Sequence, residues 1–413
     1  MKTTKLYQKD VYLKDWDARI TSVQNHSTDE ALLCITLDKT AFFPEGGGQS
    51  CDTGVLGPYE VIDVQEDNDR IIHTVRITDE CCHDRPSEGD NVHCSISWDR
   101  RFDNMQRHCG EHILSGIFFD LFGGVNRGFH MGQEYMTIDI SLEAKPEITE
   151  ITYEMALEAE LGANKVIWSD APVTVLRFDR REDAENLPLR KALAFDEDIS
   201  IVCVGSVENA ADCVACCGTH PSTAGQVGII KIYKVEKYKG MFRIYFEAGA
   251  RALNDYRLKH DILTELSNRY SSSVEDFPLK LRTQEEKLSA IKDELYHIRK
   301  AFIDSHCEKL DELLSVTDEN VVIYKLPQLS LDDVFSMGKH YMNNCTKLIM
   351  LYSQKDTSFI LVSDGSCDCG KLVKEYASFY KGKGGGNKVS ARAIFTSEND
   401  AFLFADLICK HLS

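Results

Sequence analysis

Short runs of alternating apolar and polar residues fill the first 95 positions of the chain, for example at 31–37 and 70–75. Alternation with a period of two places one face of a β-strand against a core. Turn-forming residues separate these runs. We therefore expect a β-rich N-terminal subdomain over residues 1–95.

Helical spacing replaces this alternation further along. The apolar residues that follow the helical period are Phe102, Met105, Ile113, Leu114, Ile117 and Phe118. Residues 147–165 show an acidic amphipathic pattern, which predicts a second helix with a solvated face. Alternating runs at 135–140, 199–204, 228–233 and 242–246 predict strands between and after these helices. A core of helices and strands is expected over 96–250.

A helical region follows, with expected helices at 252–270 and 278–315. Leu281, Leu288, Leu295 and Phe302 are seven residues apart, and this repeat covers only about three heptads. A hairpin of two antiparallel helices over 251–316 is therefore favoured over a long coiled coil, and an intermolecular coil remains an alternative.

The last hundred residues alternate strands and helices. Strands are expected at 321–324, 348–352 and 359–362, and helices near 331–343, 368–380 and 398–412. This pattern predicts a small α/β domain over 317–413. The whole chain is thus expected to be α+β, with a β-rich subdomain, an α/β core, a helical hairpin and a C-terminal α/β domain.

Charge limits the partners that the chain can have. Its formal net charge is −19, which argues against a general binder of polyanions. A nucleic-acid partner would need cations gathered locally. Residues 381–388 offer such a place, because they combine Lys381, Lys383 and Lys388 with Gly384, Gly385 and Gly386. This composition suits phosphate contact, and a solvated turn is an equally good interpretation.

The chain has 15 cysteines, an odd and scattered set that favours a reduced cytoplasmic protein over a disulfide framework. It shows no N-terminal signal segment and no apolar run long enough to span a bilayer, so no membrane association is expected.

Two pairs of metal-ligating residues lie about a hundred positions apart. His108 and His112 are four residues apart on the expected helix, so both imidazoles can reach one ion. Cys216 and His220 have the same spacing beside a glycine. Three nitrogens and a thiolate make a tetrahedral zinc set, which predicts one Zn²⁺ per chain.

The first pair also matches the H-x-x-E-H motif of zinc peptidases, with Glu111 as the base. Those peptidases typically complete their ligand set with a carboxylate, so Cys216 and His220 argue against this interpretation. Two histidines on a partly buried helix that bind nothing are the plainest alternative.

A glycine motif, Pro44-Glu45-Gly46-Gly47-Gly48-Gln49, lies in the β-rich subdomain. Consecutive glycines let the backbone adopt positive φ and approach a ligand closely. A flexible hairpin loop is the alternative.

The glycine motif, Asp52-Thr53-Gly54, the histidine pair and Cys216-Cys217-Gly218-Thr219-His220 stand in the order seen in the editing domain of alanyl-tRNA synthetases. Residues 1 to about 250 resemble the long form of the AlaX family, the free-standing alanyl-tRNA editing proteins. The C-terminal domain resembles, more weakly, the tRNA-contacting domain at the end of those synthetases. Cys217 is a departure, because the family usually has glycine there. Cys213 and Cys216 also form C-x-x-C, and Cys216 is favoured because it pairs with His220 at the family spacing.

The resemblance implies a zinc-dependent aminoacyl-tRNA deacylase, a carboxylic ester hydrolase acting on mischarged alanine tRNA. Serine is the expected wrong amino acid, with glycine as a second candidate. The implied zinc ligands are His108, His112, Cys216 and His220, so that residues 96–250 would form the editing core. A homodimer through the helical or C-terminal region is a further expectation.

The resemblance also implies roles for the zinc ion and for individual residues. Zinc activates a water molecule or, if four ligands bind at once, anchors the substrate or holds the pocket in shape. Glu111 and Gln49 are the catalytic candidates, and Glu111 could equally hydrogen-bond near the ligands. Gly46, Gly47 and Gly48 could cradle the terminal adenosine or an oxyanion. Thr40 is the candidate that selects the serine hydroxyl, with a strand-end role as its alternative. A zinc peptidase and a non-catalytic tRNA-binding module are the competing functions.

Overall fold

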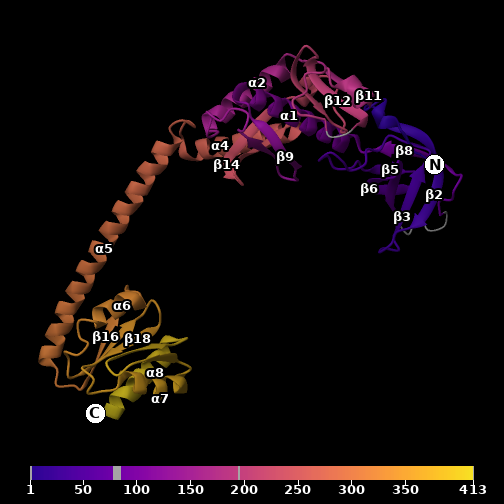
Figure 1. The fold of residues 1–413 in the computed structure, drawn as a ribbon. Coiled ribbons are helices and arrows are strands. Elements are labelled where there is room, and N and C mark those ends of the chain that lie inside the picture. The colour runs from indigo at the N-terminus through magenta and orange to yellow at the C-terminus, as the bar shows by residue number, and fades with distance from the viewer. Residues whose placement is uncertain (1, 78–84, 194–195, 413) are drawn as a thin grey trace. The chain divides into compact units, whose positions relative to one another are not determined.

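The computed structural model describes residues 2–77, 85–193 and 196–412 of the chain (Figure 1). The chain divides into two compact units, Met1–Leu266 and Ser267–Ser413. The secondary structure is mixed, which confirms an α+β class. Among the described residues, no helix is both long and apolar enough to cross a membrane.

A closed barrel forms the N-terminal part of the first unit. Its strands, in barrel order, are β2 (Asp15–Asn25), β3 (Leu32–Leu37), β7 (Arg70–Arg76), β6 (Tyr59–Asp67), β5 (Gly54–Leu56) and β8 (Asn91–Ile96). The short β1 (Thr4–Lys5) pairs in parallel with β4 (Lys39–Thr40). The inward side chains, such as Ile35, Val61 and Val75, are fully buried, as the alternation predicts.

Helices and two sheets make the rest of this unit. One sheet has the order β14 (Ile230–Tyr238), β15 (Met241–Ala248), β10 (Met136–Ser141) and β9 (Val125–Met131). The other joins β11 (Val173–Arg180), β12 (Glu197–Ser206) and β13 (Asn209–Ala215). The helices are α1 (Trp98–Phe122), α2 (Tyr153–Trp168) and the short α3 (Arg181–Ala184), with a 3-10 turn at Ala224–Val227. Helix α2 begins later than the expected residue 147, because the Thr152 hydroxyl caps it by accepting from Met155 N–H.

A buried ion pair joins the barrel to α1. Arg101 of α1 and Asp52 of the barrel both have fully buried side chains, and Arg101 Nε lies 3.0 Å from Asp52 Oδ2. The same guanidinium donates to the Ala41 carbonyl, and Asp52 accepts from Phe43 N–H at 2.7 Å. This network fixes the segment that leads into the glycine motif against the helix that carries His108.

The cysteines are mostly free thiols, with one exception. Cys203 and Cys213 face each other across β12 and β13 and form a disulfide, whereas a fully reduced chain was expected. Direct cross-strand pairing places the two side chains on one face of the sheet, which brings the sulfurs together. Cys81 and Cys82 lie outside the described residues.

Helix α4 (Gly249–Tyr270) leaves the first unit, and α5 (Phe277–Val316) opens the second. Both helices confirm the expected helical region. The apolar residues at seven-residue spacing on α5 are exposed, from 37% at Phe302 to 53% at Leu288. The expected packing of the two helices as a hairpin therefore stays a prediction.

A five-stranded sheet forms the centre of the second unit. Its order is β16 (Val321–Leu326), β17 (Leu348–Ser353), β18 (Ser358–Val362), β20 (Ser390–Ile394) and β19 (Lys383–Gly386). The remaining helices are α6 (Leu331–Gly338), α7 (Cys369–Tyr376) and α8 (Glu398–Leu412), with a 3-10 turn at Ala377–Tyr380. Residues 383–386 were expected in a loop and form an edge strand instead. Glycine permits this, because a Cβ at Gly384 would lie 1.9 Å from the Arg392 carbonyl oxygen.

Candidate metal centre and active-site pocket

The first histidine pair lies on one face of α1. Ser97 precedes the helix in an extended conformation, and Gly123 ends it with φ of 64°, its N–H bonded to Phe119 O. The ring centroids of His108 and His112 are 5.2 Å apart. Both side chains are buried, so the helix presents two imidazoles to the interior of the unit.

Two glycines on α1 allow neighbouring strands to approach the helix closely. A Cβ at Gly116 would fall 2.0 Å from the Ala211 carbonyl oxygen on β13, and a Cβ at Gly110 would fall 2.7 Å from Ala248 Cβ on β15. Any larger residue at Gly116 would push β13 away. Because β13 leads directly into Cys216, this close approach carries the second ligand pair to the first.

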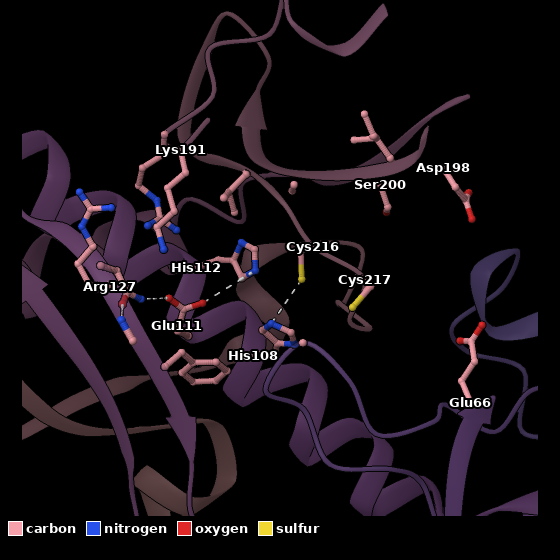
Figure 2. A pocket seen from close by; sticks show the side chains of 18 of the residues that line it. Glu66, His108, Glu111, His112, Arg127, Lys191, Asp198, Ser200, Cys216 and Cys217 are labelled. Carbon is pink, nitrogen blue, oxygen red and sulfur yellow. Dashed lines mark hydrogen bonds and ion pairs between the residues drawn. The ribbon is translucent and has the colours of Figure 1, made fainter. Parts of the chain in front are cut away.

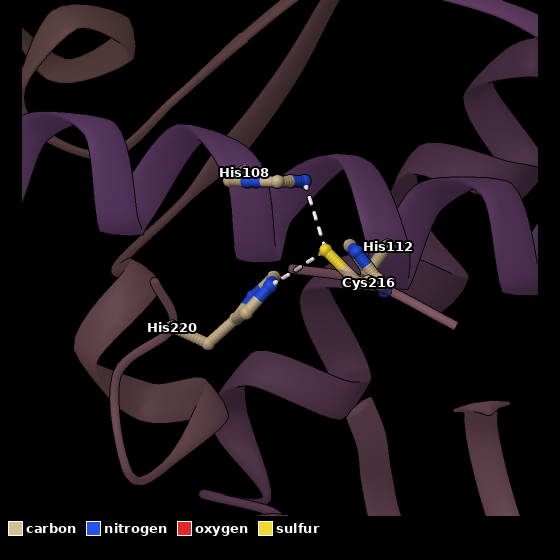
Figure 3. A group of neighbouring side chains, drawn as sticks. All are labelled: His108, His112, Cys216 and His220. Atoms are coloured by element: carbon tan, nitrogen blue, oxygen red, sulfur yellow. Dashed lines mark hydrogen bonds between the residues drawn. The ribbon is translucent and has the colours of Figure 1, made fainter. Parts of the chain in front are cut away.

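The four predicted ligands converge (Figure 3). One donor atom from each of His108, His112, Cys216 and His220 lies within 4.8 Å of the other three. Cys216 Sγ is 3.4 Å from His108 Nε2 and 3.3 Å from His220 Nε2. Gly218 leaves room for this, since a Cβ there would lie 2.3 Å from the His108 ring.

The chemistry of this cluster fits a metal ion. Burial alone would raise the pKa of the Cys216 thiol, but His108, His220 and His112 together lower that pKa well below its usual range. The thiolate is the form that binds metals. His220 Nδ1 is buried without a hydrogen-bond partner among the described residues. Three imidazoles and one thiolate are a donor set that suits zinc.

Groups around the ligands hold two of the imidazoles in place. Gln49 Oε1 accepts from His108 Nδ1 at 3.0 Å and from Thr219 N–H at 3.0 Å. Asp212 Oδ2 accepts from His112 Nδ1 at 3.0 Å. Both contacts leave Nε2 of the imidazole free to bind a metal ion. Gln49 is fully buried. Its amide contacts His108 and Thr219 and does not line the pocket.

Glu111 is held beside the ligands. Its Oε1 accepts from Ser115 Oγ at 2.6 Å and from Asn126 Nδ2 at 2.7 Å, while Oε2 lies 3.9 Å from His112 Nε2. Glu111 also lines the pocket described next. One carboxylate oxygen is thus anchored and the other lies beside the cluster of three histidines and Cys216.

A cavity of about 790 Å³ opens over the cluster, a size typical of small-ligand sites. Figure 2 shows Arg127 and Lys191 on one side of the ligands and Glu66 and Asp198 on the other. One wall of the pocket therefore carries two cations beside the hydrogen-bonded Glu111, and is called the basic wall below, while the opposite wall carries two carboxylates.

The glycine motif reaches this pocket through Gly47. Gly47 and Gly48 have φ of 59° and 80°, a conformation that favours glycine. A Cβ at Gly47 would lie 2.9 Å from Cys217 Sγ, and a Cβ at Gly48 would lie 2.8 Å from the Phe129 ring. The N–H groups of Gly47 and Gly48 have no hydrogen-bond partner among the described residues. Gly46 instead closes the turn by pairing with Gln49.

Thr40 lies elsewhere. Its hydroxyl is fully buried in the barrel, 2.9 Å from His73 Nε2, and accepts from Phe42 N–H at 3.1 Å. It is absent from the residues that line the pocket. The predicted tRNA-contacting residues lie in the second unit, where Lys381, Lys383, Gly384, Gly385, Gly386 and Lys388 are exposed on or beside the edge strand β19.

Sequence reasoning missed several groups around the site: Asn126, Arg127, Phe129, Arg190, Lys191 and Asp212. Arg190 Nε donates to Asp212 Oδ1 at 2.5 Å, which extends the contact from His112 to a third residue. Phe129 stacks on the His108 ring with a centroid distance of 5.5 Å. The adjacent cations Arg190 and Lys191 after Pro188 were a usable signal in an acidic chain. Asp212 had none.

Comparison with known proteins adds independent findings. Residues 5–100 match the family described as tRNA synthetases class II (A). Residues 199–245 match the threonyl and alanyl tRNA synthetase second additional domain. Both matches fall in the first unit.

Individual relatives extend these matches. The chain is 29% identical to the alanyl-tRNA editing protein AlaX-L of Pyrococcus horikoshii, covering 94% of this chain and 93% of that protein. It is 34% identical to AlaX-M of Methanosarcina acetivorans, over 59% of this chain and 98% of that protein. An alanine–tRNA ligase of Ignicoccus hospitalis is 27% identical, and the chain spans 42% of its length.

Proposed function

The chain belongs to the AlaX family of alanyl-tRNA editing proteins, and from this membership we propose that it is an aminoacyl-tRNA deacylase acting on mischarged alanine tRNA. The substrates are seryl-tRNA and, as a second candidate, glycyl-tRNA. The reaction hydrolyses the ester that joins the wrong amino acid to the terminal ribose.

One observation carries this proposal. The four ligand candidates, from two segments about a hundred residues apart, meet beneath a cavity that is also lined by Gly47 of the glycine motif. All these motifs are the ones by which the chain resembles the editing domain. Their convergence at one cavity supports a single site for binding and hydrolysis.

His108, His112, Cys216 and His220 would hold one zinc ion. When bound, zinc would supply positive charge for activating water or for anchoring the substrate. Gln49 and Asp212 keep the Nε2 atoms of His108 and His112 directed at the metal. Arg190 in turn holds Asp212 in position.

Other residues of this chain would act on the ester itself. Glu111 would take a proton from the attacking water; its Oε2 lies 3.9 Å from His112 Nε2 while Oε1 is anchored, which supports this role. The free N–H groups of Gly47 and Gly48 would donate to the substrate carbonyl or to the terminal adenosine.

The C-terminal domain would add affinity for tRNA through Lys381, Lys383 and Lys388, which give local positive charge in an acidic chain. A cytoplasmic location and a homodimer through α5 or the C-terminal domain belong to the same proposal. The exposed apolar residues of α5 support the homodimer.

The test is a deacylation assay with seryl-tRNA and alanyl-tRNA on the alanine tRNA, together with metal analysis. The wild-type protein should bind about one zinc per chain and release serine faster than alanine. His108→Ala and Cys216→Ala should lose both metal and deacylation, since each removes a direct ligand. Full zinc content in the double variant would refute the ligand assignment.

Cys217→Gly is the matched control, because Cys217 neighbours the ligand but its thiol packs against Gly47. It should keep its zinc and its activity. Two other outcomes would support the competing functions. Peptide cleavage that persists in Cys216→Ala would indicate a zinc peptidase, and tRNA binding without turnover would indicate a non-catalytic module.

A further inference from the structure

The basic wall of the pocket contains cations that the proposed reaction does not use. Lys191 is half-buried, lines the cavity, and has no hydrogen bond or ion pair within 4.0 Å among the described residues. Burial and the neighbouring Arg190 lower the pKa of the Lys191 ammonium, against the smaller opposing effect of the Glu111 and Asp212 charges. A partly desolvated charge without an ion-pair partner is energetically unfavourable, and an anionic ligand would stabilise it.

Arg190 provides a second unmet donor at the same wall. Its side chain is only 5% exposed. Nε and Nη2 bind Asp212, but Nη1 is buried with no partner among the described residues. Buried guanidinium donors are normally satisfied. Arg190 lines the same cavity as Lys191, so an oxyanion bound in that cavity is a candidate acceptor for Nη1.

The rest of the pocket indicates which anion this is. Arg127 stands at the rim of the basic wall, with its side chain 52% exposed and ion-paired with the equally exposed Glu143, a surface pair that a phosphate can replace. Glu66 and Asp198 face it from the opposite wall (Figure 2). An RNA backbone would be repelled by the acidic wall and attracted by the basic one. The phosphodiester nearest the reacting ester is the one on the 5′ side of the terminal adenosine.

We propose that Lys191 and Nη1 of Arg190, with Arg127 at the rim, form a subsite for the phosphodiester that precedes the terminal adenosine of the substrate. This subsite rests on the proposed deacylase function and specifies how the RNA strand is oriented in the pocket. The ester lies over the metal cluster, the terminal phosphodiester lies against Lys191, and the RNA leaves the pocket past Arg127.

Direct binding tests the subsite without any turnover. Adenosine 5′-(methyl phosphate) carries the phosphodiester and adenosine lacks it, so the ratio of their dissociation constants, measured by calorimetry, reports the subsite alone. The wild-type protein should prefer the phosphodiester by roughly tenfold or more, as expected for charge-assisted hydrogen bonds. Lys191→Met should lose most of that preference, and Lys191→Arg should keep much of it.

Lys165→Met is the matched control, because Lys165 is exposed on α2 and is absent from the residues that line the pocket. It should behave as wild type. Arg190→Met is not used, because Arg190 also holds Asp212 and through it a metal ligand. Metal content and circular dichroism of Lys191→Met should match wild type, which excludes a folding defect.

Kinetics separate this subsite from a role at the reacting carbonyl. On seryl-tRNA, Lys191→Met should raise KM roughly tenfold with kcat nearly unchanged. On 3′-seryl-adenosine, which has no phosphate, the variant should match wild type. An equal loss of kcat on both substrates would place Lys191 at the ester and overturn the subsite. Equal affinity of the wild type for adenosine and adenosine 5′-(methyl phosphate) would overturn it as well. If wild type binds the phosphodiester selectively but hydrolyses neither substrate, the subsite stands and the deacylase function fails.

Discussion

At the scale of single residues, Thr40 has a role in the barrel that can be tested beside its predicted role in selecting serine. Its hydroxyl joins His73 Nε2 and the Phe42 backbone inside the barrel. Thr40→Val keeps the shape but leaves both partners unpaired. We expect it to lower the free energy of unfolding by about 1–3 kcal/mol, measured by denaturant unfolding.

The same variant tests the selection of serine. Slower release of serine, with alanine release and metal content unchanged, would support Thr40 as the selecting group. Wild-type rates on both substrates, together with the loss of stability, would show that Thr40 is structural and that another group recognises the hydroxyl.

His73 adds a pH dependence to the barrel. It donates from Nδ1 to Ile35 O at 3.0 Å, so its Nε2 accepts from Thr40 and the ring is neutral. Burial lowers the pKa of His73 to about 4. The unfolded chain takes up a proton near pH 6.5 and the folded chain does not. The contribution of neutral His73 to the free energy of unfolding is therefore complete above that pH and is lost as pH falls towards 4.

Between pH 7 and pH 5 this one histidine should remove roughly 2 kcal/mol from the free energy of unfolding. His73→Gln cannot titrate, so its unfolding should depend less on pH by that amount. Parallel pH profiles of the variant and wild type would contradict the neutral buried state of His73.

At the scale of elements, the site depends on how closely β13 approaches α1. Gly116→Ala would place a Cβ within 2.0 Å of the Ala211 carbonyl oxygen, so β13 must move and Cys216 with it. We expect lower zinc content and a loss of about 1–3 kcal/mol in stability, as for other overpacked sites. Asp120→Ala, at an exposed position of the same helix, should change neither. Unaltered zinc affinity in Gly116→Ala would mean that the ligand pairs meet independently of this contact.

This dependence also explains which parts of the site the sequence could predict. The ligand pairs are four residues apart, and such spacing is a local property that a sequence displays. Asp212 and Lys191 reach the pocket only because a hairpin and the preceding loop pack against α1, and no local pattern encodes that. The glycines at 384–386 were open to two interpretations, and a close strand pairing with β20 was the constraint that composition alone did not reveal.

At the scale of the whole molecule, the contacts of α4 decide where a truncated protein containing only the first unit should end. A cut near residue 249 would remove the start of α4, where Arg251 Nε pairs with Asp103 at 2.9 Å and Ala250 N–H donates to Gln106 at 3.2 Å. Asp103 and Gln106 belong to the helix that carries the histidines. A chain ending at Leu266, the last residue of the first unit, retains these contacts.

Such a chain should keep its zinc and its turnover of 3′-seryl-adenosine, because the cavity is lined only by residues of the first unit. On seryl-tRNA its KM should rise, since the lysines near β19 are gone. The dependence of log(kcat/KM) on log salt should become shallower by about two units if three phosphate contacts are lost. Replacing Lys381, Lys383 and Lys388 by Gln in the full chain should reproduce much of that change. An unchanged KM in both proteins would assign the second unit to another task such as dimerisation, because the loss of three cations from a tRNA-binding surface must weaken the complex.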